Sequence, residues 1–211
     1  MLTPIGYKRT RPARLVLPLA GLCLGIALGA CAARADPPAT EQPAATARFR
    51  VSSVPYQVPP VRLVRDDGRS VLLSDEMSDG RAVFLNFIFT TCTSVCPLSS
   101  KTFADFERAL GKERARVHLI SISIDPEQDT PARLREYARQ FHAGPEWQHY
   151  TGTLAASVAA QKAFGTFRGA KMDHTPVTLV RVSPDRPWVR VDGFMTAAEL
   201  LQLYRDLLTH G

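Results

Sequence analysis

The chain has 211 residues, of which 45% are hydrophobic and 22% charged, and a formal net charge of +6. This composition is typical of one globular domain plus an appendage, with a core that needs no disulfide staples or structural metal. Four basic residues, Lys8, Arg9, Arg11 and Arg14, precede the first apolar run, and the rest of the chain holds 22 basic against 20 acidic residues. The rest of the chain is therefore nearly balanced in charge and has no basic stripe, which argues against nucleic acid as the partner.

The N-terminus predicts export. Residues 15–33 carry no charge and follow the basic cluster, which is the order of a secretory signal. The run includes residues 28–31, LGAC, which resemble the lipobox of bacterial lipoproteins, so Cys31 is the expected site of lipid attachment. An uncleaved anchor is one alternative, although nineteen uncharged residues are at the short end of a membrane span. A soluble exported form that is cut elsewhere is the other.

These features divide the chain into three parts. Residues 1–30 are expected to be a signal peptide or membrane anchor, residues 31–50 a flexible tether, and residues 51–211 the folded domain. The stretch 32–47 is rich in Ala, Pro and Thr, and it offers no large apolar residue for packing. The protein is therefore expected at a membrane, on its periplasmic or extracytoplasmic face.

The folded domain begins with a predicted β-hairpin, because apolar residues alternate between positions 56 and 73 around the turn Asp66-Asp67-Gly68. Residues 82–89, AVFLNFIF, predict a strand buried on both faces. The later pattern predicts a helix at 98–110, a strand at 117–124, helices at 130–141 and 154–164, strands at 177–182 and 188–194, and a helix at 196–209. This order predicts an α/β fold, a thioredoxin-like three-layer sandwich around a central mixed sheet.

Two cysteines remain in the mature body once Cys23 is lost with the signal and Cys31 is lipidated. They are Cys92 and Cys96, and a disulfide across three intervening residues removes little entropy from the unfolded chain, which disfavours a purely structural role. Cys96 is expected near the first turn of a helix, where free N–H groups and the helix dipole favour thiolate. Cys92, in the preceding loop, can point at the same spot.

Three short segments carry a combined signal: residues 89–97, FTTCTSVCP, residues 124–131, IDPEQDTP, and residues 172–176, MDHTP. Together they resemble the CxxxCP site, the DPxxDTP segment and the V-D-H-S/T segment of the Sco/SenC proteins, copper-binding factors for cytochrome oxidase assembly. A lone CxxxC is a weak signal, whereas the three segments in this order are specific. The resemblance covers about residues 55–210.

The resemblance implies a thioredoxin-like fold and a copper site formed by Cys92, Cys96 and His174. Soft thiolates select Cu(I), and imidazole serves either Cu(I) or Cu(II). Two sulfurs and one nitrogen leave the site open and exchangeable, unlike a structural zinc site with four protein ligands. The other histidines lack such a context and are interpreted as surface or half-buried residues: His118, His142, His149 and His210.

The acidic residues near these segments have two interpretations. Asp129 or Thr130 is predicted to cap the helix that begins near Pro131. The resemblance adds that an acidic residue near the site, Asp125, influences copper delivery or partner contact. The connection from Phe164 to the histidine is shorter than in the commoner family pattern, which is expected to limit how freely the imidazole approaches the sulfurs.

Two functions of different classes agree with these residues. The first is a metallochaperone, not a conventional enzyme, that passes copper by ligand exchange to a dinuclear copper site such as that of cytochrome c oxidase. The second is a thiol–disulfide reductase that keeps the acceptor's cysteines reduced and forms a disulfide between Cys92 and Cys96. The expected partners are a copper-accepting membrane oxidase subunit and a thiol reductant, and the protein itself is expected to be a monomer.

Overall fold

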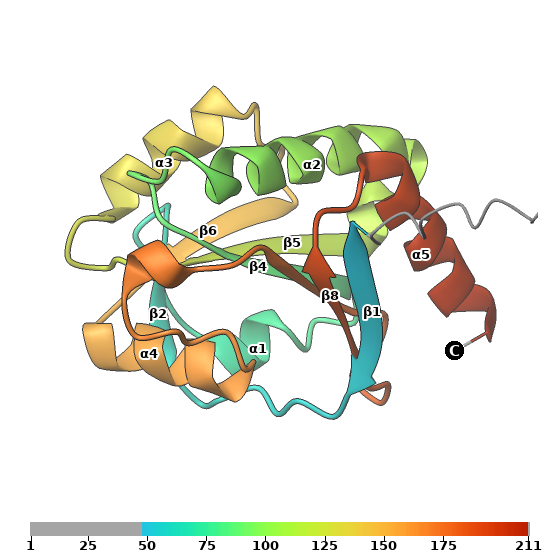
Figure 1. Ribbon diagram of the computed structural model, residues 1–211, viewed down its shortest axis with the longest axis horizontal. Coiled ribbons are helices and arrows are strands. Elements are labelled where there is room, and N and C mark those ends of the chain that lie inside the picture. The colour runs from blue at the N-terminus through green and yellow to red at the C-terminus, as the bar shows by residue number, and fades with distance from the viewer. Residues whose placement is uncertain (1–47, 211) are drawn as a thin grey trace, which may run out of the picture. The chain divides into compact units, whose positions relative to one another are not determined.

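The computed structural model describes residues 48–210, which form one mixed eight-stranded sheet with helices on both sides (Figure 1). The order across the sheet is β1-β8-β7-β4-β5-β6-β2-β3, and the pairs β4–β5 and β5–β6 are parallel. The strands are β1 (Phe49–Val54), β2 (Arg62–Arg65), β3 (Ser70–Leu72), β4 (Ala82–Ile88), β5 (Val117–Ser123), β6 (Trp147–Thr151), β7 (Val177–Arg181) and β8 (Trp188–Gly193). The predicted hairpin is confirmed as β2–β3, with Leu63 opposite Val71.

The helices cover both faces of the sheet. Figure 1 shows α2 and α3 on one side and α1 and α4 on the other. They are α1 (Leu73–Glu76), α2 (Val95–Leu110), α3 (Pro131–Gln140), α4 (Leu154–Ala163) and α5 (Ala197–His210), with short 3-10 turns η1 (Gly111–Arg116) and η2 (Lys171–Asp173).

The core is divided by β4, whose side chains are buried on both faces. Leu85 and Phe87 join the cluster that includes Phe164, whereas Phe84 joins the cluster that includes Phe103 of α2. This two-sided burial explains the nearly continuous apolar run in the sequence. β4, and therefore its carboxyl end, lies in the interior of the sheet between β7 and β5.

Two strands were not predicted from the sequence. β6 reads WQHYT, and its polar residues His149 and Thr151 are buried, so hydrophobicity alone does not reveal the strand. β1 begins at Phe49, inside the stretch 31–50 that the sequence assigns to the tether. Among residues 48–210 no helix is both long and apolar enough to span a bilayer. The predicted signal, the tether up to residue 47 and Cys31 lie outside the described residues.

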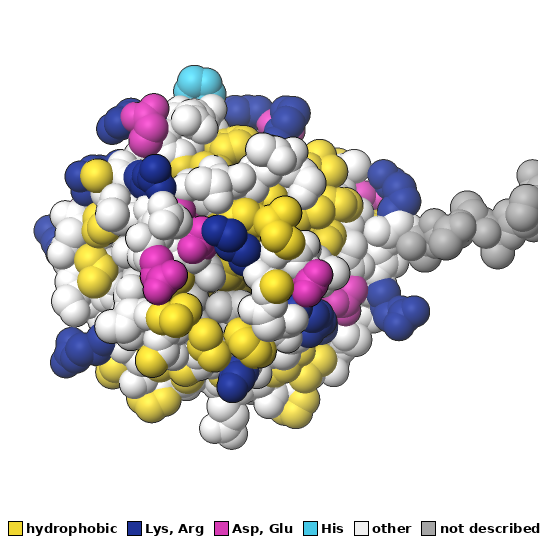
Figure 2. All heavy atoms as spheres, turned by 60° about the vertical axis from the view of Figure 1, so that its left-hand side comes forward, with side chains coloured by type: hydrophobic (Ala, Val, Ile, Leu, Met, Phe, Trp, Pro, Cys, Tyr) yellow, Lys and Arg dark blue, Asp and Glu magenta, His cyan; other side chains and the backbone are white. Residues whose placement is uncertain are grey.

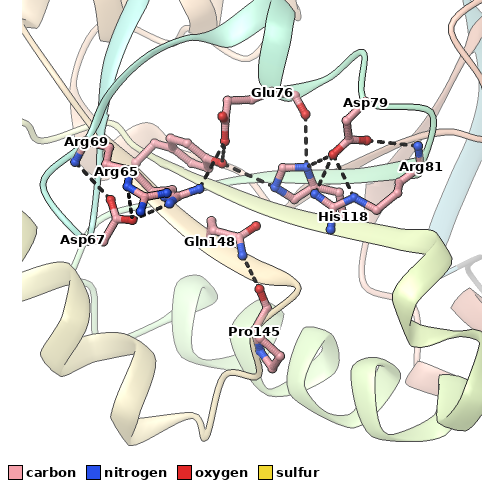
Figure 3. A network of polar contacts seen from close by, with 10 residues as sticks. Arg65, Asp67, Arg69, Glu76, Asp79, Arg81, His118, Pro145 and Gln148 are labelled. Atoms are coloured by element: carbon pink, nitrogen blue, oxygen red, sulfur yellow. Dashed lines mark hydrogen bonds and ion pairs between the residues drawn. The ribbon is translucent and has the colours of Figure 1, made fainter.

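A buried polar network joins the sheet to α1 at the amino end of β5 (Figure 3). His118 is 2% exposed; its Nδ1 lies 3.0 Å from the Glu76 carbonyl, and its Nε2 lies 3.3 Å from the Tyr150 hydroxyl. That hydroxyl donates to the Glu76 carboxylate at 2.5 Å. Burial lowers the pKa of His118. The interpretation of His118 as a surface or half-buried residue is therefore wrong, because the ring is buried and lies within a polar network with Glu76 and Tyr150.

His149 is the second histidine for which that interpretation is wrong, since it is fully buried on β6. Its ring lies against Trp147, with 4.9 Å between ring centres, and neither ring nitrogen has a hydrogen-bond partner among residues 48–210. The nearest carboxylate oxygen, on Asp66, is 3.8 Å from Nδ1, too far for a hydrogen bond. Burial lowers the pKa of His149 to about 3. The folded protein therefore keeps this ring neutral.

The first prediction concerns the pH dependence of stability. Below pH 6.5 the unfolded chain protonates His149 and the folded chain does not, so stability falls as pH drops from about 6.5 towards 3. Between pH 6.5 and 5 this group should cost about 2 kcal/mol. His149→Phe, which loses no hydrogen bond, should lessen the stability difference between pH 7 and 5 by that amount in urea unfolding. His142→Asn, at an exposed position with φ of 55°, is the control and should leave the difference unchanged. An equal pH dependence in His149→Phe and the unmodified protein would contradict the prediction.

Candidate functional site

The cysteine loop begins where β4 ends, at Ile88. The chain turns at once, because the Cys92 N–H donates to the Phe89 carbonyl at 3.1 Å, and α2 begins at Val95. Cys92 is 7% exposed and Cys96 is 1% exposed, and both carry free thiols. The loop therefore brings both sulfurs to the amino end of α2.

The environments of the two sulfurs differ. The Cys96 N–H donates to the Cys92 sulfur at 3.4 Å, and the Ser94 hydroxyl lies 3.8 Å from the same atom. Burial alone raises the pKa of Cys92, but hydrogen bonds from the Cys96 thiol and from nearby N–H groups outweigh it, so the pKa is lowered. Burial raises the pKa of Cys96, and its thiol's hydrogen bond to Cys92 raises it further. Cys92 is therefore the cysteine that ionises first.

This result corrects the expectation that the helix favours thiolate at Cys96. Cys96 does lie in the first turn of α2, but its sulfur is buried in the core cluster. A free N–H group of that turn points instead at Cys92, which precedes the helix. The helix N-terminus thus stabilises negative charge on the residue ahead of it.

Asp129 anchors the cysteine loop. It is fully buried, and both its carboxylate oxygens lie 3.2 Å from the Thr90 N–H. The Thr90 hydroxyl donates to it at 2.5 Å and the Ser123 hydroxyl at 2.6 Å. Thr130 is the residue that caps α3, since its hydroxyl accepts from the Arg133 N–H at 3.3 Å. Asp129 is therefore not the cap; it ties the loop after β4 to the end of β5.

Asp125 follows β5 and is 8% exposed. Its carboxylate accepts a hydrogen bond from the Lys171 ammonium group at 2.5 Å. The same ammonium group lies 5.6 Å from the centre of the Phe89 ring. Asp125 is thereby tied to the segment that carries His174, and its influence on copper delivery remains a prediction.

His174 lies just before β7, between η2 and Pro176. Its Nε2 is 2.9 Å from the Phe87 carbonyl, so Nε2 carries the proton and Nδ1 carries the lone pair. Burial lowers the pKa of His174, although the bond to Phe87 opposes this effect. Among residues 48–210, no three His, Cys, Asp or Glu side chains form a group that could hold a metal ion. The structure pairs the thiols and turns the imidazole towards Phe87, so ligation by all three residues remains a prediction.

Three polar residues at the site were missed by the sequence reasoning: Thr90, Ser123 and Lys171. Ser123 had a detectable signal, because a hydroxyl in a strand that is buried throughout needs a partner inside the protein. Lys171 had none, since a lysine three residues before a histidine matches no characteristic spacing. The short connection to His174 was the indirect indication that this segment is constrained.

Comparison with known sequences relates this chain to SCO1 and SenC proteins. A family model described as SCO1/SenC matches residues 54–191. The SCO1 protein homolog of Bacillus subtilis is 34% identical over 98 residues, which are 46% of this chain and 50% of that protein. The mitochondrial protein SCO1 homolog 1 of Arabidopsis thaliana is 36% identical over 84 residues, 39% of this chain and 25% of that protein. The chain thus spans half or less of the length of these relatives.

Solved structures of Sco proteins share the architecture. ScoI of Bradyrhizobium japonicum, determined with copper bound, has a TM-score of 0.58 and 26% identity over 70% of this chain and 96% of that one. BsSco, described as a member of the Sco family of cytochrome c oxidase assembly proteins with a disulfide switch, has a TM-score of 0.63 and 24% identity over 76% and 98%. These likenesses confirm the predicted thioredoxin-like fold class.

The second prediction is that the two thiols react at different rates. Iodoacetamide at pH 7.5 should alkylate Cys92 at least about tenfold faster than Cys96, because the thiolate is the nucleophile and only Cys92 has a lowered pKa. Peptide mass spectrometry against time measures both rates in the reduced protein. Cys96→Ala should slow alkylation of Cys92, because it removes the thiol that donates a hydrogen bond to the Cys92 sulfur. Equal rates at the two cysteines would refute the assignment.

The third prediction separates the roles of two neighbouring residues. Asp129→Asn should destabilise the fold by about 1–3 kcal/mol, because the amide nitrogen leaves buried donors without an acceptor. It should also increase hydrogen exchange at the Thr90 and Cys92 amides. Thr130→Ala, which removes the cap of α3, should cost about 1 kcal/mol and leave exchange in the cysteine loop unchanged. If hydrogen exchange in the cysteine loop rises equally in both variants, Asp129 does not anchor the loop more than Thr130 does.

Proposed function

Because the chain belongs to the SCO1/SenC family, we propose that it is an extracytoplasmic copper-binding protein that assists assembly of a dinuclear copper site. An acceptor such as cytochrome c oxidase fits this role. The observation that carries the proposal is the reduced pair Cys92 and Cys96, with one sulfur favoured for ionisation by a helix N–H. The copper bound to ScoI of Bradyrhizobium japonicum supports the choice of metal.

In this proposal Cys92 and Cys96 bind copper as thiolates, and His174 supplies the third ligand. Thiolates favour Cu(I), and the neutral imidazole already has a lone pair on Nδ1. Copper then leaves by ligand exchange, as each acceptor ligand replaces one donor ligand. Such a transfer needs neither a general acid nor a general base, and it needs at least one ligand that can detach.

A thiol–disulfide reductase is the second candidate, and the unequal pKa values of the two cysteines favour it. The Cys92 thiolate would attack a disulfide of the acceptor, forming a mixed disulfide and releasing one acceptor thiolate. The Cys96 thiol would lose its proton and attack the Cys92 sulfur, releasing the second acceptor thiolate and closing the disulfide. Two electrons pass to the acceptor, so an external thiol must reduce the pair before another cycle.

The location and partners belong to the same proposal. A lipid on Cys31, or an uncleaved anchor over residues 15–33, would tether the domain to the membrane that holds the acceptor. The acceptor would be a membrane oxidase subunit, and a thiol reductant would maintain Cys92 and Cys96. One structural neighbour, from Bacillus anthracis, is described as a SCO1/SenC family lipoprotein, which agrees with a lipid anchor. Its TM-score is 0.63, with 18% identity over 74% of this chain and 97% of that one.

The fourth prediction tests copper binding in the full chain, purified in detergent. The reduced protein should bind one Cu(I) per chain in a competition with a chelator. His174→Ala should weaken binding by at least about tenfold, since it removes one ligand of three, whereas His142→Asn should change nothing. The disulfide form should lose the metal on desalting, because metal and disulfide compete for the same sulfurs.

Two outcomes would count against copper binding at this site. Unchanged affinity in His174→Ala removes the imidazole from the ligand set. Stoichiometric copper in the fully oxidised protein, held as tightly as in the reduced one, removes the thiolates. Rapid copper-independent reduction of a model disulfide, unaffected by His174→Ala, would favour the reductase instead.

A further inference from the structure

Lys171 makes two contacts that join the histidine segment to the ends of two strands. Its ammonium group lies 2.5 Å from a carboxylate oxygen of Asp125, which follows β5. The same group lies 5.6 Å from the centre of the ring of Phe89, which follows β4. An ammonium group in this position is attracted by the carboxylate and by the ring face. One side chain thus fastens the segment beside the start of the cysteine loop.

Lys171 and His174 belong to one tight turn, so a displacement of one residue also displaces the other. The N–H of His174 donates to the carbonyl of Lys171 at 3.2 Å, and the N–H of Asp173 donates to the carbonyl of Ala170 at 3.1 Å. While Lys171 holds Asp125, the turn also holds the imidazole against the Phe87 carbonyl. In this arrangement the imidazole and the two thiols do not form a metal-binding group among the described residues.

The segment has little packing of its own. Met172 is 76% exposed, and a hollow of about 50 Å³ lies beneath the segment, lined by residues that include Ile124, Gln161 and Thr166. The segment lies on the left of Figure 1, and Figure 2, which turns that side forward, shows charged side chains of both signs among apolar ones. A thinly packed segment with space beneath it can shift at low cost once its polar contacts are released.

We propose that Lys171 is a positioning residue whose ion pair with Asp125 latches the turn of residues 171–174, so that His174 reaches the two thiols only after the latch opens. This inference rests on the proposed function for its copper-loading part, whereas the latch itself is a property of the metal-free protein. Asp125 is nearly buried and Lys171 is half-exposed, so breaking the pair leaves a carboxylate without its cation. The open state is therefore a minor one. The rate of copper loading is reduced in proportion to the small fraction of molecules in that state.

The matched variants isolate this ion pair. Lys171→Met keeps an unbranched stem over Phe89 and removes the charge, whereas Lys171→Arg keeps the charge and should preserve the latch. Lys162→Met is the control, because Lys162 also lies over an aromatic ring, that of Phe167 at 5.2 Å, and has no pairing with Asp125. Asp125→Asn removes the ion pair from the other side and should act like Lys171→Met without adding to it in the double variant.

The first measurement uses the reduced, metal-free full chain in detergent. Hydrogen exchange at the amides of Asp173 and His174 should be about fivefold faster in Lys171→Met, the size expected for losing one partly exposed ion pair. Lys171→Arg and Lys162→Met should match the unmodified protein. Exchange that does not change in Lys171→Met would overturn the latch, whatever the protein does with copper.

The second measurement follows Cu(I) loading from a chelator by stopped flow. Lys171→Met should load about fivefold faster than the unmodified protein, and this gain should vanish in a His174→Ala background. A merely structural role of Lys171 would not depend on the imidazole. Loading at the unmodified rate despite faster exchange would show that His174 reaches the thiols without release of the segment, which overturns the proposal. If the unmodified chain binds no copper, the proposed function fails and with it the loading role, while the exchange result still decides whether the latch exists.

Discussion

The arrangement of the site depends on one buried carboxylate that has no cationic partner in the described part of the chain. Asp129 is fully buried, and its charge is tolerated because hydroxyl and N–H donors from Thr90 and Ser123 surround its two oxygens. Thr90 belongs to the loop after β4 and Ser123 to the end of β5, so one side chain joins the carboxyl ends of two parallel strands. Cys92 is two residues from Thr90, and the direction of its sulfur follows from this anchor. The loop is therefore held by hydrogen bonds to a side chain buried in the protein.

The same rigidity produces the difference between the cysteines. Because the loop is fixed, the first turn of α2 directs an N–H at the Cys92 sulfur, while the Cys96 sulfur stays among core residues. Both candidate functions make use of this difference. A disulfide exchange needs one ionised thiol to attack and one to resolve, and a soft metal needs a thiolate to bind first. The geometry of the pair alone thus does not distinguish copper binding from disulfide exchange. The two functions differ in whether they require His174.

The sequence predicted most elements of the fold because their signals are local. The buried run of β4 and the hairpin at Asp66-Asp67-Gly68 depend on periodicity and turn chemistry, which a single sequence displays. β6 was not predicted, because its burial depends on tertiary packing around His149 and not on the hydrophobicity of its own residues. At the site, the segment motifs identified Cys92, Cys96 and His174 as candidate ligands, but they did not indicate the contacts made by neighbouring residues. Asp129 was interpreted as one of two candidate caps beside Thr130, since no local pattern shows that a carboxylate will accept hydrogen bonds from a loop 39 residues earlier.

Under the proposed function, a chain that delivers copper must bind the metal and must also release it. The structure offers two kinds of element for these two demands. The sulfurs belong to a loop anchored to the core, so they stay close to their present positions. The imidazole belongs to a short turn with an exposed Met172 and a hollow beneath it, held mainly by polar contacts. Polar contacts of this kind can be exchanged one for another at small net cost, whereas the core cannot be repacked cheaply. If copper binds as we propose, His174 is the ligand that must move, and a partner that competes for Lys171 or Asp125 would act on the copper site without touching the metal.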